Sequence, residues 1–157
     1  MISILIPTYN NLDYLKIAVE SIRKNTMSLK YEILLHINEG SDGTLDFAKS
    51  NQLKHTYSVN NLGLCSSINL ISKKATFDYL LYSHDDMYFC PGWDDALLKE
   101  LRSIKNNLFY FSGTMIEQKS AHISADFGAT FHDFDEVRLL NNFKNLSYFD
   151  HQGSHFA

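Results

Sequence analysis

The sequence predicts an α/β fold, with a mostly parallel sheet that is covered by helices on both faces. Short runs of apolar residues, such as residues 4–6 and 33–35, have the composition of strands that are buried on both faces. Segments with helical periodicity separate these runs. The alternation of strand and helix continues from residue 1 to about residue 112, which is typical of parallel sheets with helical crossovers.

The first strand and the first helix follow from the opening residues. We expect a central strand over residues 3–6 that stops pairing at Pro7, because proline has no N–H to donate to a neighbouring strand. Asn10 or Asn11 is expected to cap the helix that follows. The apolar stripe of that helix consists of Leu12, Leu15, Val19 and Ile22.

The later elements are expected in the same alternating order. Further strands are predicted at residues 31–37, 54–59, 79–83 and 108–112. Helices are predicted after Thr44, which would cap a short one, then along the stripe Leu64, Ile68 and Ile71, and after Trp93, with Leu97, Leu98, Leu101 and Ile104 buried. Beyond residue 112 the alternation breaks down. Residues 121–131 suit a strand with an irregularity at Gly128, and residues 133–144 carry a modest helical pattern.

Composition limits the class of protein. The 157 residues are 45% hydrophobic and 20% charged, which suits one globular domain with a core of its own. A net charge of −4 does not suggest a nucleic-acid-binding surface. The apolar runs are too short to span a bilayer, and the N-terminus lacks the pattern of a signal peptide. Cys65 and Cys90 match no metal-ligand spacing, so we expect two reduced thiols and a cytoplasmic location.

The clearest chemical signal is a pair of adjacent carboxylates, Asp85 and Asp86, directly after the apolar run 79–82. In open α/β sheets, ligands bind at the carboxyl ends of the strands. Adjacent carboxylates repel each other, and a divalent cation such as Mg²⁺ or Mn²⁺ relieves that repulsion through hard oxygen ligands. The alternative for this segment is a polar strand end followed by a Pro-Gly turn.

Three further segments follow predicted strands or open a helix. Residues 7–10 (Pro-Thr-Tyr-Asn) lie beside the expected crevice, and Glu39 is placed to accept a hydrogen bond from a base or ribose. Asn61 and Gly63 belong to an N-x-G loop in which glycine permits a close backbone approach. Each segment alone also fits an ordinary turn or cap. The phosphate-binding P-loop and the G-x-G-x-x-G fingerprint are both absent, which argues against a nicotinamide dehydrogenase.

Taken together, four segments resemble the family 2 glycosyltransferases of the GT-A fold. The matching segments are S-I-L-I-P-T-Y-N at residues 3–10, I-N-E-G-S-D-G-T at 37–44, N-L-G-L-C-S-S-I-N at 61–69 and H-D-D-M-Y-F-C-P-G-W at 84–93. Their order and spacing agree as well as their content. The resemblance covers about the first two thirds of the chain. It implies a donor that is a nucleotide-sugar, expected to be a UDP-sugar, and an inverting transfer to a glycan or lipid-linked acceptor, as in polysaccharide biosynthesis.

The resemblance also implies roles for individual residues. Thr8 and Tyr9 would frame the nucleotide, Glu39 would read the base, Asp85 would bind ribose or metal-held water, and Asp86 would coordinate the metal. The full set expected to bind the nucleotide is Pro7, Thr8, Tyr9, Asn10, Glu39, Asn61, Gly63 and Asp85. Asp85, His151 and His155 are further candidates for the metal. The sequence departs from the family at Asn38, where an acidic residue is usual, and at His84, where Asp or Asn is common.

The C-terminal part departs further from the family. We divide the chain into a nucleotide-sugar-binding core, residues 1–112, and the start of an acceptor-side region, residues 113–157, that we expect to be incomplete. No recognisable general base follows the core, and the available carboxylates are Asp126, Asp133, Asp135 and Asp150. We therefore expect these residues to bind donor but to transfer sugar poorly, and to expose apolar surface that favours homo-oligomers. The alternatives are a non-catalytic nucleotide-sugar-binding module, an inactive fragment, or a phosphohydrolase.

Overall fold

The computed structural model describes residues 1–106, 108–110, 112–119 and 123–146. The chain forms two compact units, residues 1–100 and 101–157. The functional division that we predicted, at residue 112, stays a prediction. Within the described residues, no helix combines the length and the apolar character that crossing a bilayer requires.

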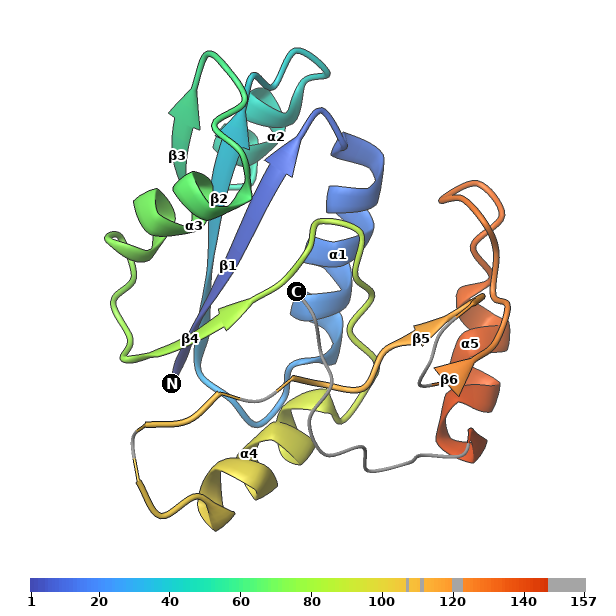
Figure 1. Cartoon of the computed structure of the whole chain (residues 1–157). Helices are drawn as coiled ribbons and strands as arrows, with labels where there is room; N and C mark the ends of the chain where they lie inside the picture. The colour runs from blue at the N-terminus through green and yellow to red at the C-terminus, as the bar shows by residue number, and fades with distance from the viewer. Residues whose placement is uncertain (107, 111, 120–122, 147–157) are drawn as a thin grey trace. The chain divides into compact units, whose positions relative to one another are not determined.

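The first unit is a parallel α/β sheet, as the sequence predicts (Figure 1). Four parallel strands lie in the order β3-β2-β1-β4, so β1 and β2 are central. The strands are β1 Ile2–Tyr9, β2 Tyr31–Asn38, β3 Lys54–Ser58 and β4 Tyr79–Tyr82. The helices are α1 Leu12–Asn25, α2 Thr44–Ser50, α3 Leu64–Ser72 and α4 Trp93–Ser103.

Helices cover both faces of this sheet, which confirms the predicted layering. One face of β1, carrying Ile4 and Ile6, packs with side chains of α1, α2 and α4 in the main hydrophobic core. The other face, carrying Leu5, packs under Ile68 and Ile71 of α3. Because the middle of β1 is buried on both faces, Ile4, Leu5 and Ile6 are apolar in succession, and this explains the apolar run in the sequence.

The prediction that pairing stops at Pro7 is wrong, because β1 pairs with β2 as far as Tyr9. The amide of Ile2 donates to Lys30 beside β2, whereas the carbonyl of Leu5 accepts from Ser83 on the β4 side. Alternate residues of a strand direct their peptide groups to opposite sides, so Pro7 faces β4, as Leu5 does. Pairing with β4 has already ended there. The missing N–H of Pro7 therefore interrupts no hydrogen bond.

Asn11 occupies the N-cap position of α1, as predicted, but its side chain makes no capping hydrogen bond. The backbone N–H of Leu12 instead donates to Oδ2 of Asp42, 2.8 Å away in the loop between β2 and α2. In the opposite direction, Oδ1 of Asn10 accepts from the N–H of Ser41 at 2.9 Å. The two loops at the carboxyl ends of β1 and β2 therefore fix each other.

At the other end of α1, a buried carboxylate joins the α1–β2 loop to α4. Oδ2 of Asp94 accepts from the backbone N–H groups of Met27, Ser28 and Leu29 at 2.8, 2.6 and 3.2 Å. The Asp94 residue is fully buried, and its second oxygen, Oδ1, has no hydrogen-bond partner among the described residues. Three converging donors stabilise the buried negative charge and hold the first turn of α4 against the loop.

A second carboxylate, Glu32, organises the amino ends of the strands. Oε1 of Glu32 accepts from the hydroxyl of Ser3 at 2.6 Å and from the N–H and hydroxyl of Thr76 at 2.6 and 2.7 Å. Its Oε2 pairs with Nζ of Lys54 at 2.6 Å. One side chain therefore connects β1, β2, β3 and the loop before β4.

Acidification is expected to destabilise the first unit through Glu32. Burial opposes ionisation of this carboxyl, but hydrogen bonds from Lys54, Ser3 and Thr76 outweigh burial and lower its pKa from 4.5 to about 2. The resulting stabilisation is present above pH 4.5 and is lost as the pH falls from there toward 2. Glu32→Gln should cost about 2 kcal/mol at pH 7 and flatten this pH dependence in urea denaturation. If the stability of Glu32→Gln depended on pH as that of the wild type does, Glu32 would not be the source of the acid sensitivity. Lys54→Met, which removes one partner of Glu32, is the control and should lower stability less.

The second unit is small, and its described part departs from prediction in two places. It contains β5 Ile116–Glu117 and β6 Ile123–Ser124, which pair in parallel, then α5 Glu136–Asn142 and the short 3₁₀ helix η1 Phe143–Asn145. The expected helix in 133–144 is confirmed. The expected strand at 121–131 reduces to β6 among the described residues, and Gly128 takes a φ of 119° in the turn after it.

The strand predicted at 108–112 is wrong for the residues that the structure describes there, which belong to no strand. Leu108 and Tyr110 are 93% and 83% exposed, so two of the apolar side chains that suggested a strand bury little surface, while Phe109 is half-buried. In α4, Leu97 and Leu98 are half-buried and pack against the core as expected, and Leu101 and, just beyond the helix, Ile104 are also half-buried.

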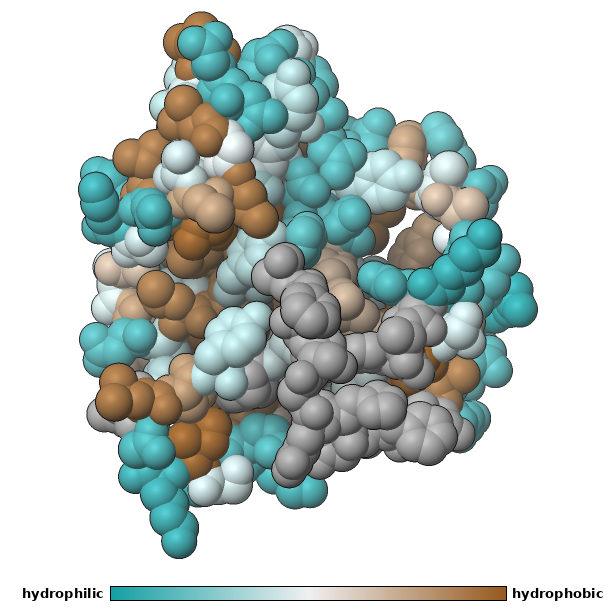
Figure 2. Space-filling model, viewed as in Figure 1, coloured by the Kyte–Doolittle hydropathy of each residue, from teal (hydrophilic) through white to brown (hydrophobic). Residues whose placement is uncertain are grey.

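Apolar side chains also remain exposed on α3 and β4. Leu64, Leu70 and Leu80 are 49%, 38% and 51% exposed, and Figure 2 shows hydrophobic residues gathered over this part of the surface. Such a surface is consistent with the expectation of self-association, which stays a prediction.

Candidate functional site

A polar crevice of about 370 Å³ opens at the carboxyl ends of the strands. It lies where β1 and β4 diverge, which is the place where open α/β sheets bind ligands. The turn after β1, the loop between β3 and α3, and the segment after β4 supply most of its wall. The lining residues are Pro7, Thr8, Tyr9, Asn10, Asn11, Asn38, Asn61, Gly63, Leu64, Ser67, Tyr82, His84 and Asp85.

The crevice brings together most of the residues that the sequence singles out. Seven of the eight residues predicted to bind the nucleotide line it, and they come from segments up to about eighty residues apart: Pro7, Thr8, Tyr9, Asn10, Asn61, Gly63 and Asp85. Glu39 and Asp86 are not among the lining residues. Glu39 joins the site through Tyr9, and Asp86 follows Asp85 with an exposed side chain.

Asp85 is the central acid of the crevice. Its pKa is raised, first by burial and to a smaller extent by the neighbouring charge of Asp86, although Thr8 and Asn11 act in the opposite direction. Nδ2 of Asn11 donates to Oδ1 of Asp85 at 3.0 Å and so fixes its orientation. The Thr8 hydroxyl lies close enough to lower the pKa of Asp85, but its oxygen makes no hydrogen bond of good geometry within the described residues.

These carboxylates fit one kind of metal site. No group of three or more His, Cys, Asp or Glu side chains among the described residues is arranged to hold a metal ion by itself. Asp85 and Asp86 offer two adjacent sets of carboxylate oxygens, one held by Asn11 and one exposed. Mg²⁺ is typically bound by one or two carboxylates, with waters and substrate phosphates completing its shell. The donor set therefore suits a cation that arrives with a phosphorylated ligand.

Glu39 and Tyr9 form a hydrogen-bonded pair beside the crevice. Tyr9 is 49% exposed, and its pKa is raised mainly by the hydrogen bond from its hydroxyl to the Glu39 carboxylate, with the charge of Glu39 adding to the effect. Ser41 Oγ also donates to Oε1 of Glu39, at 3.3 Å. Glu39 has a φ of 62°, an uncommon conformation for a residue with a side chain. The turn thus holds an acceptor carboxylate close to the crevice.

Asn38 has a larger part in the site than the sequence suggested. Its Nδ2 donates to the carbonyl of Thr8 at 3.3 Å and to Ser67 Oγ at 3.1 Å. Its Oδ1 accepts from the N–H of Leu62 at 2.9 Å and from Ser58 Oγ at 3.2 Å. The buried amide therefore holds β1, β3, the following loop and α3 together. A carboxylate at this position would have no N–H groups to donate to the Thr8 carbonyl, which gives the departure from the family pattern a physical reason.

Tyr82 and His84 form an aromatic part of the wall that sequence reasoning did not assign. The Tyr82 hydroxyl lies 3.0 Å from Nε2 of His84, and the two ring centroids are 5.0 Å apart. Burial raises the pKa of Tyr82, and the charges of Asp85 and Asp86 raise it further. Both residues stand next to the Asp-Asp pair in sequence, so the end of β4 could have revealed them. Flat rings of this kind can pack against a sugar or a base.

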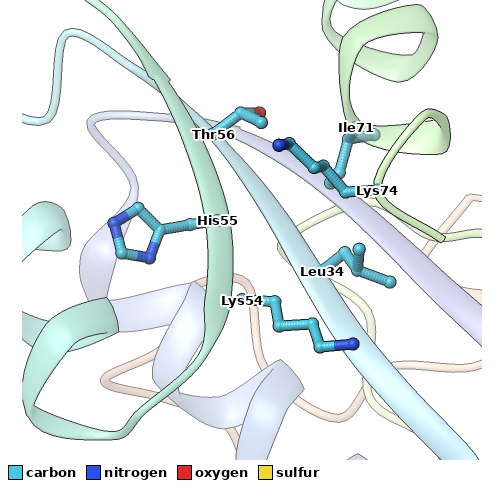
Figure 3. Close-up of a pocket in the computed structure, with 6 residues that line it drawn as sticks. All are labelled: Leu34, Lys54, His55, Thr56, Ile71 and Lys74. Carbon is cyan, nitrogen blue, oxygen red and sulfur yellow. The ribbon is translucent and has the colours of Figure 1, made fainter. Parts of the chain in front are cut away.

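A second hollow, of about 310 Å³, lies beside β3 and the end of α3 (Figure 3). It is a weaker candidate because it borders Lys54, the first residue of β3, and so lies toward the amino ends of the strands. Nζ of Lys54 is already paired with Glu32. Figure 3 shows His55 projecting away from the other labelled side chains. The lining residues are Leu34, Lys54, His55, Thr56, Ile71 and Lys74.

The side chain of Asp126 makes hydrogen bonds within the turn that contains it. Its Oδ1 accepts from the N–H of Gly128 at 3.0 Å and from Nε2 of Gln118 at 2.8 Å. These hydrogen bonds, that from Gly128 first, lower the pKa of Asp126. A lowered pKa makes the carboxylate a weaker base.

The other candidate bases either make local hydrogen bonds, as Asp126 does, or lie outside the described part of the chain. Asp133 accepts from a threonine hydroxyl three residues before it, and Asp135 caps α5. Asp150, His151 and His155 lie outside the described residues, so their predicted roles stay predictions.

Comparison with known proteins identifies relatives of this chain. The family model described as "Glycosyl transferase family 2" matches residues 3–155. An uncharacterized glycosyltransferase of Rickettsia typhi is 32% identical over 125 residues, which cover 76% of this chain and 38% of that protein. One from Rickettsia bellii is 27% identical over 74% of this chain and 17% of its own length. The chain thus spans well under half the length of these relatives.

Solved structures share the fold of this chain at low sequence identity. S. aureus TarS 1-349 in complex with UDP-GlcNAc has a TM-score of 0.56 and 21% identity, over 65% of this chain and 31% of that one. The mannosyltransferase PcManGT from Pyrobaculum calidifontis, in complex with GDP-Man and Mn²⁺, has a TM-score of 0.56 and 18% identity, over 68% and 32%. Both are GT-A glycosyltransferases. Because the family model matches residues 3–155, which is nearly the whole of this chain, the chain belongs to the family 2 glycosyltransferases and has the GT-A fold.

Proposed function

We propose that the crevice binds a nucleoside-diphosphate sugar together with Mn²⁺ or Mg²⁺, and that the sugar is transferred to a glycan or lipid-linked acceptor. The observation that carries this proposal is the crevice itself. It gathers residues from four separate segments at the carboxyl ends of the strands, and its lining includes the half-buried Asp85, which the exposed Asp86 follows in the sequence. A UDP-sugar is the donor that we favour, since a structure of the same fold is a complex with UDP-GlcNAc.

In this proposal each residue has a separate task. Tyr9 and Glu39 receive the base, and Asn11 holds the Asp85 carboxylate toward the ribose or the metal-bound water. Asp86, with Asp85 beside it, would hold the cation, which would offset the negative charge that grows on the leaving diphosphate. The acceptor hydroxyl would attack the anomeric carbon opposite the diphosphate, so that the configuration inverts as the old C–O bond breaks.

Two free cysteines, Cys65 and Cys90, suit a reducing compartment, and we place the reaction in the cytoplasm. Polysaccharide biosynthesis is the corresponding cellular role.

The proposal is tested by titrating the chain with UDP and UDP-sugars, in the presence of Mn²⁺ and in EDTA, by calorimetry. We expect saturable one-site binding that strengthens with the metal. GDP and ADP measure selectivity for the base. If no nucleoside diphosphate binds under either condition, the proposed function is wrong.

A second candidate function is a nucleotide-sugar-binding module that does not catalyse transfer. The engagement of Asp126, Asp133 and Asp135 in local turns and a helix cap favours it. Slow hydrolysis of the bound donor, or transfer to an added acceptor, would decide for the enzyme. A phosphatase assay separately tests the phosphohydrolase alternative.

Glu39→Gln is expected to weaken UDP binding about tenfold, because a charge-assisted hydrogen bond to the base becomes a neutral one. Glutamine can adopt the same backbone φ, so the melting temperature should change little. Calorimetry with UDP and a thermal melt measure the two effects. Ser41→Ala, which removes a neighbouring donor to Glu39, is the control and should retain most of the affinity. Unchanged UDP affinity in Glu39→Gln would remove Glu39 from the site.

A further inference from the structure

The N-terminus of α3 opens at the crevice without a cap. Gly63 is the N-cap residue, and no side chain accepts a hydrogen bond from the first turn at that position. The first hydrogen bond within the helix runs from the N–H of Ser67 to the carbonyl of Gly63. The N–H groups of Leu64, Cys65 and Ser66 precede it and therefore have no partner within the helix. All three residues are exposed.

The space in front of this turn is open. The N–H of Gly63 is occupied by Oδ1 of Asn61 at 2.9 Å, which holds the loop in place. A Cβ atom at Gly63 would meet no atom within 4 Å. Gly63 and Leu64 both line the crevice, so the start of this turn borders the space that a ligand would occupy.

The charge of the crevice makes this turn important. No lysine or arginine is among the described residues that line the crevice, whereas Asp85 adds negative charge. A nucleoside diphosphate brings further negative charge. Apart from a bound cation, the partial positive charge at the N-terminus of a helix is what the backbone can offer to such an anion.

A buried hydroxyl gives independent evidence for a ligand in this crevice. Thr8 is only 3% exposed, and although its hydroxyl lies near the Asp85 carboxylate, its Oγ1 makes no hydrogen bond of good geometry among the described residues. Thr8 lines the same crevice as Gly63 and Leu64. A buried polar atom without a partner costs free energy, and an oxygen of a bound ligand would accept its proton.

From these observations we propose that the first turn of α3 binds the diphosphate of the donor, through the backbone N–H groups of Leu64, Cys65 and Ser66, with the Thr8 hydroxyl contributing from β1. The inference rests on the proposed function and adds to it an anion subsite that is separate from the metal-binding carboxylates. It explains how a crevice whose described lining includes no lysine or arginine holds a strongly anionic ligand.

The test places a negative charge in this turn. Ser66→Asp adds a carboxylate near the proposed phosphates, and Ser66→Asn is the neutral control of the same size. An acidic residue in the first turn favours a helix, so the Asp variant should fold at least as well as wild type. Its UDP affinity should fall about tenfold, by repulsion over a few ångströms in a solvated site. Uridine, which lacks the diphosphate, should bind all three proteins equally.

Calorimetry with UDP and with uridine is run in Mn²⁺ and again in EDTA, since the EDTA arm removes any effect of the new carboxylate on metal binding. A selective loss of UDP affinity in Ser66→Asp supports the subsite. Equal UDP affinity in wild type, Ser66→Asp and Ser66→Asn overturns the subsite and leaves the proposed function standing. If wild type binds neither UDP nor uridine, the proposed function fails and the inference fails with it.

Discussion

Asp86→Ala is expected to abolish the metal-dependent part of UDP binding, lowering the affinity in Mn²⁺ at least about a hundredfold. The exposed carboxylate of Asp86 stands beside the half-buried Asp85, whose orientation is fixed by Asn11. With Asp86 absent, Asp85 is the carboxylate that the described lining of the crevice still offers to a cation. Metal ligands of this kind are strong contributors because the cation neutralises phosphate charge that the protein otherwise leaves unpaired.

The measurement is a UDP titration by calorimetry with and without Mn²⁺, for wild type and Asp86→Ala. Asp78→Ala is the matched control, since Asp78 is an exposed aspartate just before the other end of β4. The control should bind as wild type does. In EDTA, Asp86→Ala should bind UDP no more weakly than wild type, because the change removes negative charge. If Asp86→Ala retained wild-type affinity in Mn²⁺, the metal assignment would be wrong.

Asp94→Ala is expected to lower the free energy of unfolding by about 3 to 4 kcal/mol. Three backbone N–H groups, of Met27, Ser28 and Leu29, converge on one oxygen of this fully buried residue. Alanine would leave these donors without their acceptor, and an unsatisfied buried group costs about 1 to 3 kcal/mol. Total stabilities of small domains are about 5 to 15 kcal/mol, so the loss would be large.

Urea denaturation followed by circular dichroism measures this loss. Asp94→Asn keeps one carbonyl oxygen and should lie between wild type and alanine. Asp95→Ala removes the neighbouring, exposed carboxylate and should change stability by less than about 1 kcal/mol. A difference of under 1 kcal/mol between Asp94→Ala and Asp95→Ala would show that the buried carboxylate is not a main connection between the α1–β2 loop and α4.

Much of the crevice could be predicted because a parallel sheet has a simple rule for its ligands. The carboxyl ends of its strands meet along one edge, so residues just after apolar runs must lie near one another. Pro7 to Asn10 and Asp85 follow apolar runs in this way, and all line the crevice. The apolar run of β1 is buried and marks its own end, whereas β4 is largely exposed, and the roles of these residues came from the resemblance to the family.

The rest depended on contacts between distant segments, which a sequence pattern does not contain. Asp42 caps α1 from 30 residues away, and Asp94 binds a loop more than 60 residues before it. Nothing near either residue identifies its partner. The same is true of Asn38, whose amide connects β1 to α3, and which the sequence presents only as an exception to an acidic pattern. The wrong strand at 108–112 has a related cause, because local apolar character does not reveal whether a pairing partner exists.

The position of Pro7 has a consequence for the behaviour of the chain in concentrated solution. Beyond Leu5, the side of β1 that faces β4 pairs with no strand of the described residues, and an unpaired strand side is a template on which a strand from another molecule can add. Pro7 removes the backbone donor that such an addition would need first. The opening between the two strands can thus admit a small ligand while it resists edge-to-edge aggregation. Replacing this proline would therefore endanger solubility before it affected the pairing of β1 with β2.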